Sequence, residues 1–164
     1  MQNQTLRKNL SILKMMFKTH LAFGFLVGML LLQLFRPANQ ILFMALVMFA
    51  SVLPDIDHPD SKIGKNIKII GFLFEHRGFF HSVFALVLFT FPVYYFFKSY
   101  TLGFAVLAGY AAHMIADCIT TQGIMPLHPI SRIKIRGFIK TSGFIEYILF
   151  IVVVLFDIVK LLNL

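Results

Sequence analysis

Five apolar runs separated by short polar connections restrict this chain to a helical membrane fold. Hydrophobic residues make up 59% of the 164 residues and charged residues 13%, with a mean hydropathy of +0.83, which is far from the soluble average. Apolar runs of about this length can cross a bilayer as helices. We therefore predict an all-α bundle of four to five transmembrane helices in a single domain, residues 1–164. The runs cover residues 21–35, 41–53, 79–97, 101–117 and 144–162.

The second run is shorter than the others. A hydrocarbon core of roughly 30 Å needs about 20 helical residues at 1.5 Å each. Residues 41–53 fall short of this length, and Pro54 can end the helix directly after them. We expect the polar end of this run to stop below the headgroups, which would draw Asp55 and Asp57 slightly into the membrane.

Lys and Arg residues predict the orientation. Twelve of the 15 lie before the first run, between the second and third, or between the fourth and fifth. By the positive-inside rule this side is cytoplasmic, with the N-terminus inside and the C-terminus outside. The net charge of +8 then matches the anionic inner leaflet and needs no nucleic acid. We expect the first run to be retained rather than cleaved, because no small-x-small site follows it. The single Cys118 excludes an internal disulfide.

Three polar segments have patterns of their own. Residues 5–18 and 62–74 place apolar residues at helical spacing with basic residues between them, which predicts two interfacial amphipathic helices. Residues 132–136 alternate basic and apolar side chains, as a short strand or an extended arm does.

The topology brings eight His and Asp residues to the cytoplasmic face from four separate runs. Neutral imidazole and carboxylate are the usual ligands of zinc and related divalent ions, and a catalytic site keeps a water position open. Eight candidates suffice for one or two ions, most simply zinc, with manganese or magnesium as alternatives. The eight residues are His20, Asp55, Asp57, His58, His76, His81, His113 and Asp117.

Each residue has a predicted role. His20, Asp57, His58, His76, His81, His113 and Asp117 are predicted metal ligands, and Asp55 is predicted to activate water. Arg77, beside His76, is the predicted contact for a phosphate or oxyanion, because guanidinium binds such groups in bidentate fashion.

Each group of these residues also has a structural interpretation that requires no metal. A single His at a helix end is usually a cap or an interfacial anchor. His113 and Asp117, four residues apart on one helix face, also form a plausible hydrogen-bonded pair between packed helices. The acidic cluster after residue 53 is also a good turn sequence. The convergence of all of them on one face favours a metal site, since ionisable groups in membrane spans are costly and usually functional.

These motifs also carry a family resemblance. They are Thr19-His20 with Gly24, Leu53-Pro54-Asp55-Ile56-Asp57-His58, His76-Arg77-Gly78 with His81-Ser82, Gly109-Tyr110 with His113 and Asp117, and Thr121 through Gly123 to Pro129. In this combination the chain resembles the YdjM-like family of LexA-regulated, membrane-bound metal-dependent hydrolases. The resemblance implies a bacterial inner-membrane hydrolase. A more distant similarity to zinc-dependent phospholipase C and nuclease P1, which have a His-x-x-x-Asp helix pair, implies phosphoester chemistry.

We therefore expect a hydrolase that acts on an ester or phosphoester, of a lipid, at the cytoplasmic face of the inner membrane. Membrane lipids, anionic phospholipids among them, are the expected partners. Two alternatives remain open: a divalent metal-ion transporter, whose site belongs near the bilayer midplane, and a non-catalytic membrane scaffold, which needs neither His81 nor Asp117.

Overall fold

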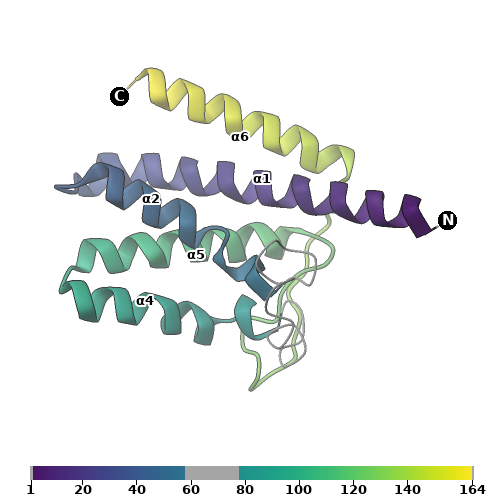
Figure 1. The fold of residues 1–164 in the computed structure, drawn as a ribbon, viewed down its shortest axis with the longest axis horizontal. Coiled ribbons are helices and arrows are strands. Elements are labelled where there is room, and N and C mark those ends of the chain that lie inside the picture. The colour runs from purple at the N-terminus through teal and green to yellow at the C-terminus, as the bar shows by residue number, and fades with distance from the viewer. Residues whose placement is uncertain (1, 58–77, 164) are drawn as a thin grey trace.

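The computed structural model describes residues 2–57 and 78–163, and in these residues every named element of secondary structure is a helix or a 3-10 turn (Figure 1). This confirms the predicted all-α class, and the described residues contain no strand. Two 3-10 turns, η1 (Leu53–Asp57) and η2 (Phe79–His81), accompany the longer helices. The helices are α1 (Gln2–Phe35), α2 (Gln40–Ala50), α4 (Val83–Phe97), α5 (Tyr100–Ile119) and α6 (Phe144–Leu162).

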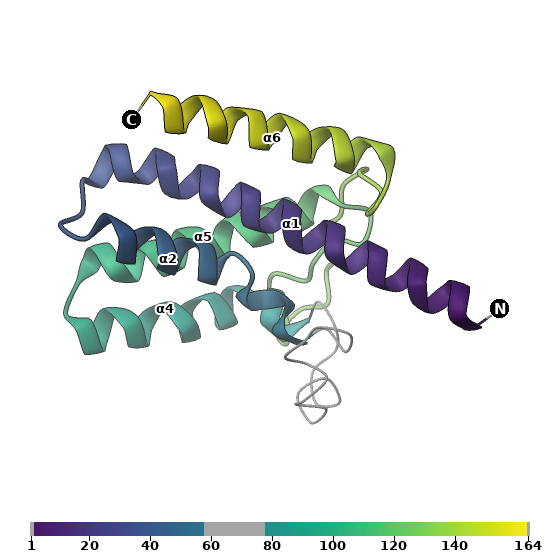
Figure 2. The same ribbon diagram turned by 45° about the horizontal axis from the view of Figure 1, so that its top comes forward.

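The helices lie side by side, with α5 in the middle. Helix α5 packs against α1, α2 and α4, and α6 packs against α1 at the edge of the bundle (Figures 1 and 2). The chain turns at residues 36–39 and 98–99 at one end. At the other end lie η1, η2 and the connection 120–143, which we call the loop end. The N-terminal part of α1 extends beyond the loop end in both views.

Small residues allow α1, α2 and α5 to approach closely. A Cβ at Gly109 of α5 would collide with the backbone carbonyl of Val47 in α2, and one at Gly24 of α1 would collide with the side chain of Ser51. Such contacts are the usual device for packing helices in membranes, where apolar side chains gain little by leaving lipid. The fully buried Phe43, Val47 and Tyr110 fill the space around these crossings.

The helix boundaries differ from the sequence prediction at three places. Residues 2–35 form one continuous helix, where a surface helix and a separate span were predicted, because no Gly or Pro interrupts the chain before residue 24. Helix α2 ends at Ala50, three residues before the predicted end of the apolar run, and residues 53–57 form the separate 3-10 turn η1. The third apolar run begins with the 3-10 turn η2, and its helix starts only at Val83 because Ser82 caps it: the Ser82 hydroxyl accepts a hydrogen bond from the Ala85 N–H at 3.3 Å.

Two of the described helical segments are long and apolar enough to cross a bilayer by length and composition, Phe17–Phe35 and Tyr100–Ile119. Helices α2 and α4 are apolar but have only 11 and 15 residues. Helix α6 has 19 residues and carries Glu146, Asp157 and Lys160. The predicted number of four to five spans therefore stays a prediction.

Replacing Gly109 with Ala is expected to lower the thermal unfolding temperature of the detergent-purified protein. The new methyl group forces α2 away from α5, and overpacking of this kind typically costs about 1–3 kcal/mol, more than the roughly 1 kcal/mol gained in helix propensity. Ile115→Ala is the control, because this side chain on the same helix is 55% exposed. An unfolding temperature for Gly109→Ala equal to that of the wild type would contradict the close packing of α2 on α5.

Candidate metal centre

Five His and Asp side chains meet at the loop end, although they come from four different elements. Helix α1 contributes His20, η1 contributes Asp55, η2 contributes His81, and α5 contributes His113 and Asp117. Four of them are essentially buried, and only the Asp55 side chain, 18% exposed, reaches the surface. The polar cluster is therefore enclosed by the helices and open on the side of Asp55.

Asp117 lies at the centre of the cluster. Its Oδ1 is 3.3 Å from His20 Nε2, and its Oδ2 is 3.3 Å from His81 Nε2. His113, one helical turn earlier on α5, places its Nε2 3.6 Å from the same Oδ2. One carboxylate therefore faces three imidazole nitrogens from three elements.

Asp55 is a second carboxylate close to two of these imidazoles. Its Oδ1 is 3.7 Å from His113 Nε2 and 3.9 Å from His81 Nε2. The His20 ring stacks on the His113 ring, with centroids 3.9 Å apart. Two overlapping groups of three, each with ligand atoms within 4.8 Å of one another, could hold a metal ion: His20, Asp55 and His113, and His81, His113 and Asp117.

The hydrogen bond at Nδ1 of the His113 ring determines which nitrogen of this imidazole is free to bind a cation. His113 Nδ1 is 2.8 Å from the Ser51 carbonyl oxygen, which only accepts hydrogen bonds, so Nδ1 carries the proton. In the neutral ring, Nε2 then presents a lone pair toward His81 Nε2, 3.2 Å away, and toward both carboxylates. A buried lone pair that faces carboxylate oxygens favours a shared cation, or a proton on the neighbouring His81 Nε2.

The donor set fits a divalent metal ion. Metal-binding His residues usually donate their second ring N–H to a carbonyl or carboxylate, which fixes the ring and its tautomer, as the Ser51 carbonyl does for His113. Imidazole nitrogen and carboxylate oxygen are the ligands that zinc prefers alongside thiolate. The described residues therefore contain a cluster of the right chemistry and spacing for an ion.

Local electrostatics place two of these residues, both outside the long helices, in the ligating form. Burial lowers the pKa of His81 below its ordinary value, so this imidazole is neutral at neutral pH. For Asp55, burial acts to raise the pKa, but the neighbouring His113, His20 and His81 together outweigh it and the pKa is lowered. A neutral imidazole and an ionised carboxylate are the states that bind metals without competition from protons.

A short turn holds His81 in place. The Ser82 hydroxyl donates to the Phe79 carbonyl at 2.6 Å and caps α4, and the Val83 N–H donates to the Pro126 carbonyl at 2.9 Å. The Tyr110 hydroxyl on α5 donates to the Phe80 carbonyl from the other side. These bonds attach η2 to α5 and to the connection 120–143, so the position of His81 depends on all three segments.

The structure brings together part of the predicted site. The side chains of His20, Asp55, His81, His113 and Asp117 meet, with Asp55 near enough to be a ligand as well as the predicted water-activating group. The backbone of Asp57 lies in η1, and its side chain is outside the described residues. His58, His76 and Arg77 also lie outside them, so their roles stay predictions.

Sequence reasoning missed two residues beside the cluster. Ser51 contributes through its backbone carbonyl, for which a side-chain pattern gives no signal. Glu146, 5% exposed in the first turn of α6, accepts hydrogen bonds from the Thr19 hydroxyl at 3.2 Å and from the Ser142 N–H. It is the first acidic residue after Asp117 in the sequence, which was an available signal. Glu146 lines a cavity of about 80 Å³ that also contacts His20 and Asp117.

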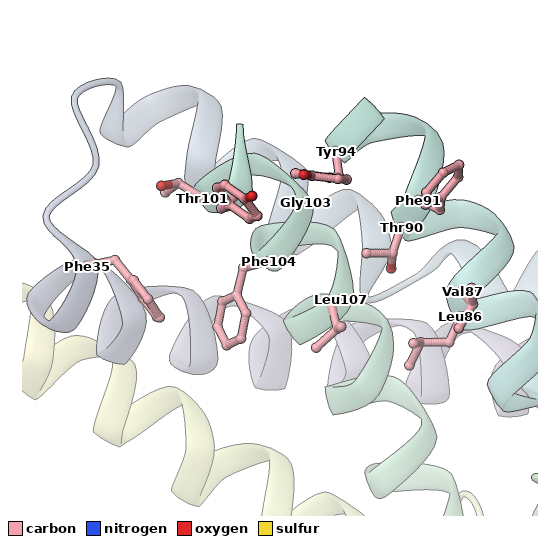
Figure 3. Close-up of a pocket in the computed structure, with 11 residues that line it drawn as sticks. Phe35, Leu86, Val87, Thr90, Phe91, Tyr94, Thr101, Gly103, Phe104 and Leu107 are labelled. Carbon is pink, nitrogen blue, oxygen red and sulfur yellow. The ribbon is translucent and has the colours of Figure 1, made fainter. Parts of the chain in front are cut away.

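A larger groove of about 590 Å³ lies elsewhere, between α4 and α5 beside the C-terminal end of α1 (Figure 3). Its walls are apolar and aromatic, with Phe91, Phe104 and Leu107 among them, and its hydroxyl groups come from Thr90, Thr101, Tyr94 and Tyr100. None of its lining residues is a His, Cys, Asp or Glu. Among the described residues, the candidate metal ligands therefore lie at the loop end and not in this groove.

An all-helical bundle with spans long enough for a bilayer and a His/Asp cluster at one end defines a membrane protein with a candidate metal centre. The family model of the YdjM inner membrane protein matches residues 15–162, and the chain belongs to this family. Membership confirms the predicted family and the membrane location, and the more distant similarity to phospholipase C and nuclease P1 stays a prediction.

Among known proteins, the chain is 41% identical over 88 residues to the inner membrane protein YdjM of Escherichia coli (strain K12) and equally similar to that of Shigella flexneri. These alignments cover 48% of this chain and 44% of each relative. It is also 30% identical over 96 residues to YvsG of Bacillus subtilis (strain 168), an uncharacterized protein, with 56% of this chain and 60% of the relative covered. The chain thus aligns with about half the length of these relatives. No solved structure matches it.

Elemental analysis of the detergent-purified protein is expected to find a divalent transition metal in stoichiometric amount. His113→Ala and His81→Ala are each expected to lower metal affinity more than the roughly 10- to 100-fold typical of losing a supporting group, because they remove direct donors. His128→Ala is the control, since this His lies in the 120–143 connection outside both donor groups. Metal retention in both cluster variants, at the level of the control, would refute the assignment.

Proposed function

We propose that this protein is a membrane-bound metal-dependent hydrolase that acts on an ester or phosphoester, of a lipid, at the cytoplasmic face of the inner membrane. The observation that carries the proposal is the convergence of His20, Asp55, His81, His113 and Asp117 on one enclosed site. Zinc is the metal that this nitrogen and oxygen donor set favours most. An ion bound there would acidify a water to a pKa of roughly 7 and polarise the oxygen of the scissile group.

The chain's own residues divide the remaining work. His20, His81, His113 and Asp117, all within 4% of complete burial, would hold the ion and exclude bulk water. Asp55, the one cluster residue with an exposed edge, is the group that a substrate meets first, and its lowered pKa keeps it able to accept a proton from water. Arg77, outside the described residues, is the proposed contact for the phosphate or oxyanion.

The position of the site supports a lipid substrate and a cytoplasmic orientation. The cluster lies at the end of α5, where a candidate membrane span ends, so an acyl chain beside the bundle would bring its ester or phosphate group to this level. The described part of the loop end carries Arg132, Lys134, Arg136 and Lys140, one of the three basic groups on which the positive-inside prediction rests. We infer a multi-pass arrangement with the N-terminus in the cytoplasm.

A divalent metal-ion transporter is the second candidate, because a His-x-x-x-Asp pair on a membrane helix also suits cation transport. A transport site belongs near the bilayer midplane with access from both faces. His113 and Asp117 lie instead in the last two turns of α5, beside the 3-10 turns at one end of the bundle. This placement favours the hydrolase.

With metal-loaded protein, we expect turnover of p-nitrophenyl ester or phosphodiester probes, or of phosphatidylglycerol or phosphatidylethanolamine in vesicles. Asp55→Asn should lower kcat by roughly 10²–10⁴-fold, the typical contribution of a general base, while most of the metal stays bound. Asp157→Asn, which removes another buried acid near the opposite end of α6, should leave kcat unchanged. Metal-loaded protein that hydrolyses none of these probes would contradict the proposal.

A further inference from the structure

The connection 120–143 presents a surface that the proposed metal centre does not use. We call residues 124–139 of this connection the α5–α6 arm. Ile130, Ile133 and Phe138 are each more than 70% exposed on it. Arg132, Lys134 and Arg136 alternate with them and are exposed too, and no Asp or Glu occurs between residues 118 and 145. The arm thus combines exposed apolar side chains with positive charge and has no acidic residue of its own.

Backbone hydrogen bonds hold the arm in a fixed place. Ile124 and Ile135 exchange two hydrogen bonds of 2.9 Å each in an antiparallel bridge, and the Gly137 N–H donates to the Thr120 carbonyl at 2.9 Å. Gly123 makes the turn before the bridge possible, with a positive φ of 63° that other residues rarely adopt. Of residues 132–136, for which a short strand or an extended arm was predicted, Ile135 forms this isolated bridge and none belongs to a strand.

The irregular backbone limits where the arm can lie. Inside the hydrocarbon core of a bilayer, lipid-exposed irregular segments do not occur, because their peptide groups would lack partners. In bulk water, a row of exposed Ile and Phe side chains is unfavourable. The membrane–water interface satisfies both requirements, and basic residues interleaved with apolar ones are the pattern of interfacial segments.

We propose that the α5–α6 arm binds anionic phospholipid at the surface of the protein's own membrane. Ile130, Ile133 and Phe138 would enter the acyl boundary, and Arg132, Lys134 and Arg136 would contact the headgroup phosphates. Charge complementarity selects this occupant, because anionic lipids attract Lys and Arg close to a membrane surface and the arm carries no acid. An acidic protein would match the charge but would leave the apolar side chains of the arm exposed to water.

The arm is continuous with the metal centre. Thr120, three residues after Asp117, pairs with Ile139 in a parallel bridge. Ile139 then lines the 80 Å³ cavity that contacts His20 and Asp117. A lipid headgroup held by the arm would therefore be retained close to the site where hydrolysis is proposed. This last step rests on the proposed function, whereas lipid binding by the arm does not.

The chain contains no Trp, so a single Trp can report the depth of the arm. In vesicles of phosphatidylcholine and brominated phosphatidylglycerol, the fluorescence of Phe138→Trp is expected to be strongly quenched. Phe80→Trp is the control, because the Phe80 side chain of η2 is buried and stacks on Phe89 of α4, where bromine cannot approach it. Fluorescence of Phe138→Trp that brominated lipid leaves unchanged, and that aqueous iodide quenches, would overturn the proposal.

Headgroup preference is tested by counting lipids retained on the protein by native mass spectrometry. In the triple variant Arg132→Gln, Lys134→Gln, Arg136→Gln, the ratio of retained phosphatidylglycerol to retained phosphatidylcholine is expected to fall by about tenfold. The matched control removes three basic residues elsewhere, Arg36→Gln, Lys98→Gln and Lys160→Gln, and should retain the preference. A triple variant with unchanged preference, or a wild type without preference, would refute the role of the arm.

Hydrolysis assays distinguish lipid binding by the α5–α6 arm from the proposed hydrolase activity of the metal centre. If both proposals hold, the triple variant cleaves a soluble p-nitrophenyl probe at the wild-type rate but loses activity on phosphatidylglycerol vesicles. A wild type that binds anionic lipid through the arm but cleaves nothing would retain the arm proposal and contradict the hydrolase. Equal loss on both probes would indicate that the substitutions damage the metal centre, and would count against the arm as a separate lipid-binding surface.

Discussion

The structure depends on placing three imidazoles and two carboxylates inside a bundle of apolar helices. Burying a polar or ionisable group without a partner is costly, and more so beside lipid. In this protein the partners are the other members of the cluster, and they come from four elements that are far apart in the sequence. The positions of α1, η1, η2 and α5 at the loop end are therefore linked, since a shift of any one of them leaves buried nitrogen or oxygen atoms without a partner.

The packing of the helices serves this arrangement directly. Gly24 and Gly109 allow α1 and α5 to contact the end of α2, which brings Ser51 close to His113. Because α2 ends at Ala50, the Ser51 carbonyl is not used within that helix and is available to His113 Nδ1. The end of one apolar helix thereby fixes the tautomer of a candidate ligand on another. Pro54, which follows, is consistent with a helix that stops at this point.

The sequence was sufficient for the helical class and for much of the cluster. Apolar runs place each His and Asp near a run end, and the spacing of His113 and Asp117 places both on one face of a helix. Consecutive helical runs point in opposite directions, so the end of one run and the start of the next lie on the same side. Residues at these ends can therefore come together. The same reasoning could not find the Ser51 carbonyl, because any residue has one, or the burial of Glu146, which depends on how α6 packs against Thr19. It also divided α1 in two, since a change from basic to apolar composition does not interrupt a helix when no Gly or Pro lies at the change.

X-ray absorption spectroscopy at the metal edge of the zinc-loaded protein in detergent tests the central claim most directly, because it measures the atoms bound to the ion. We expect nitrogen and oxygen neighbours at about 2.0–2.2 Å, with the multiple-scattering signature of at least two imidazole rings and no sulfur. A first shell that contains sulfur at about 2.3 Å, from Cys118, or one made of oxygen without imidazole, would contradict it.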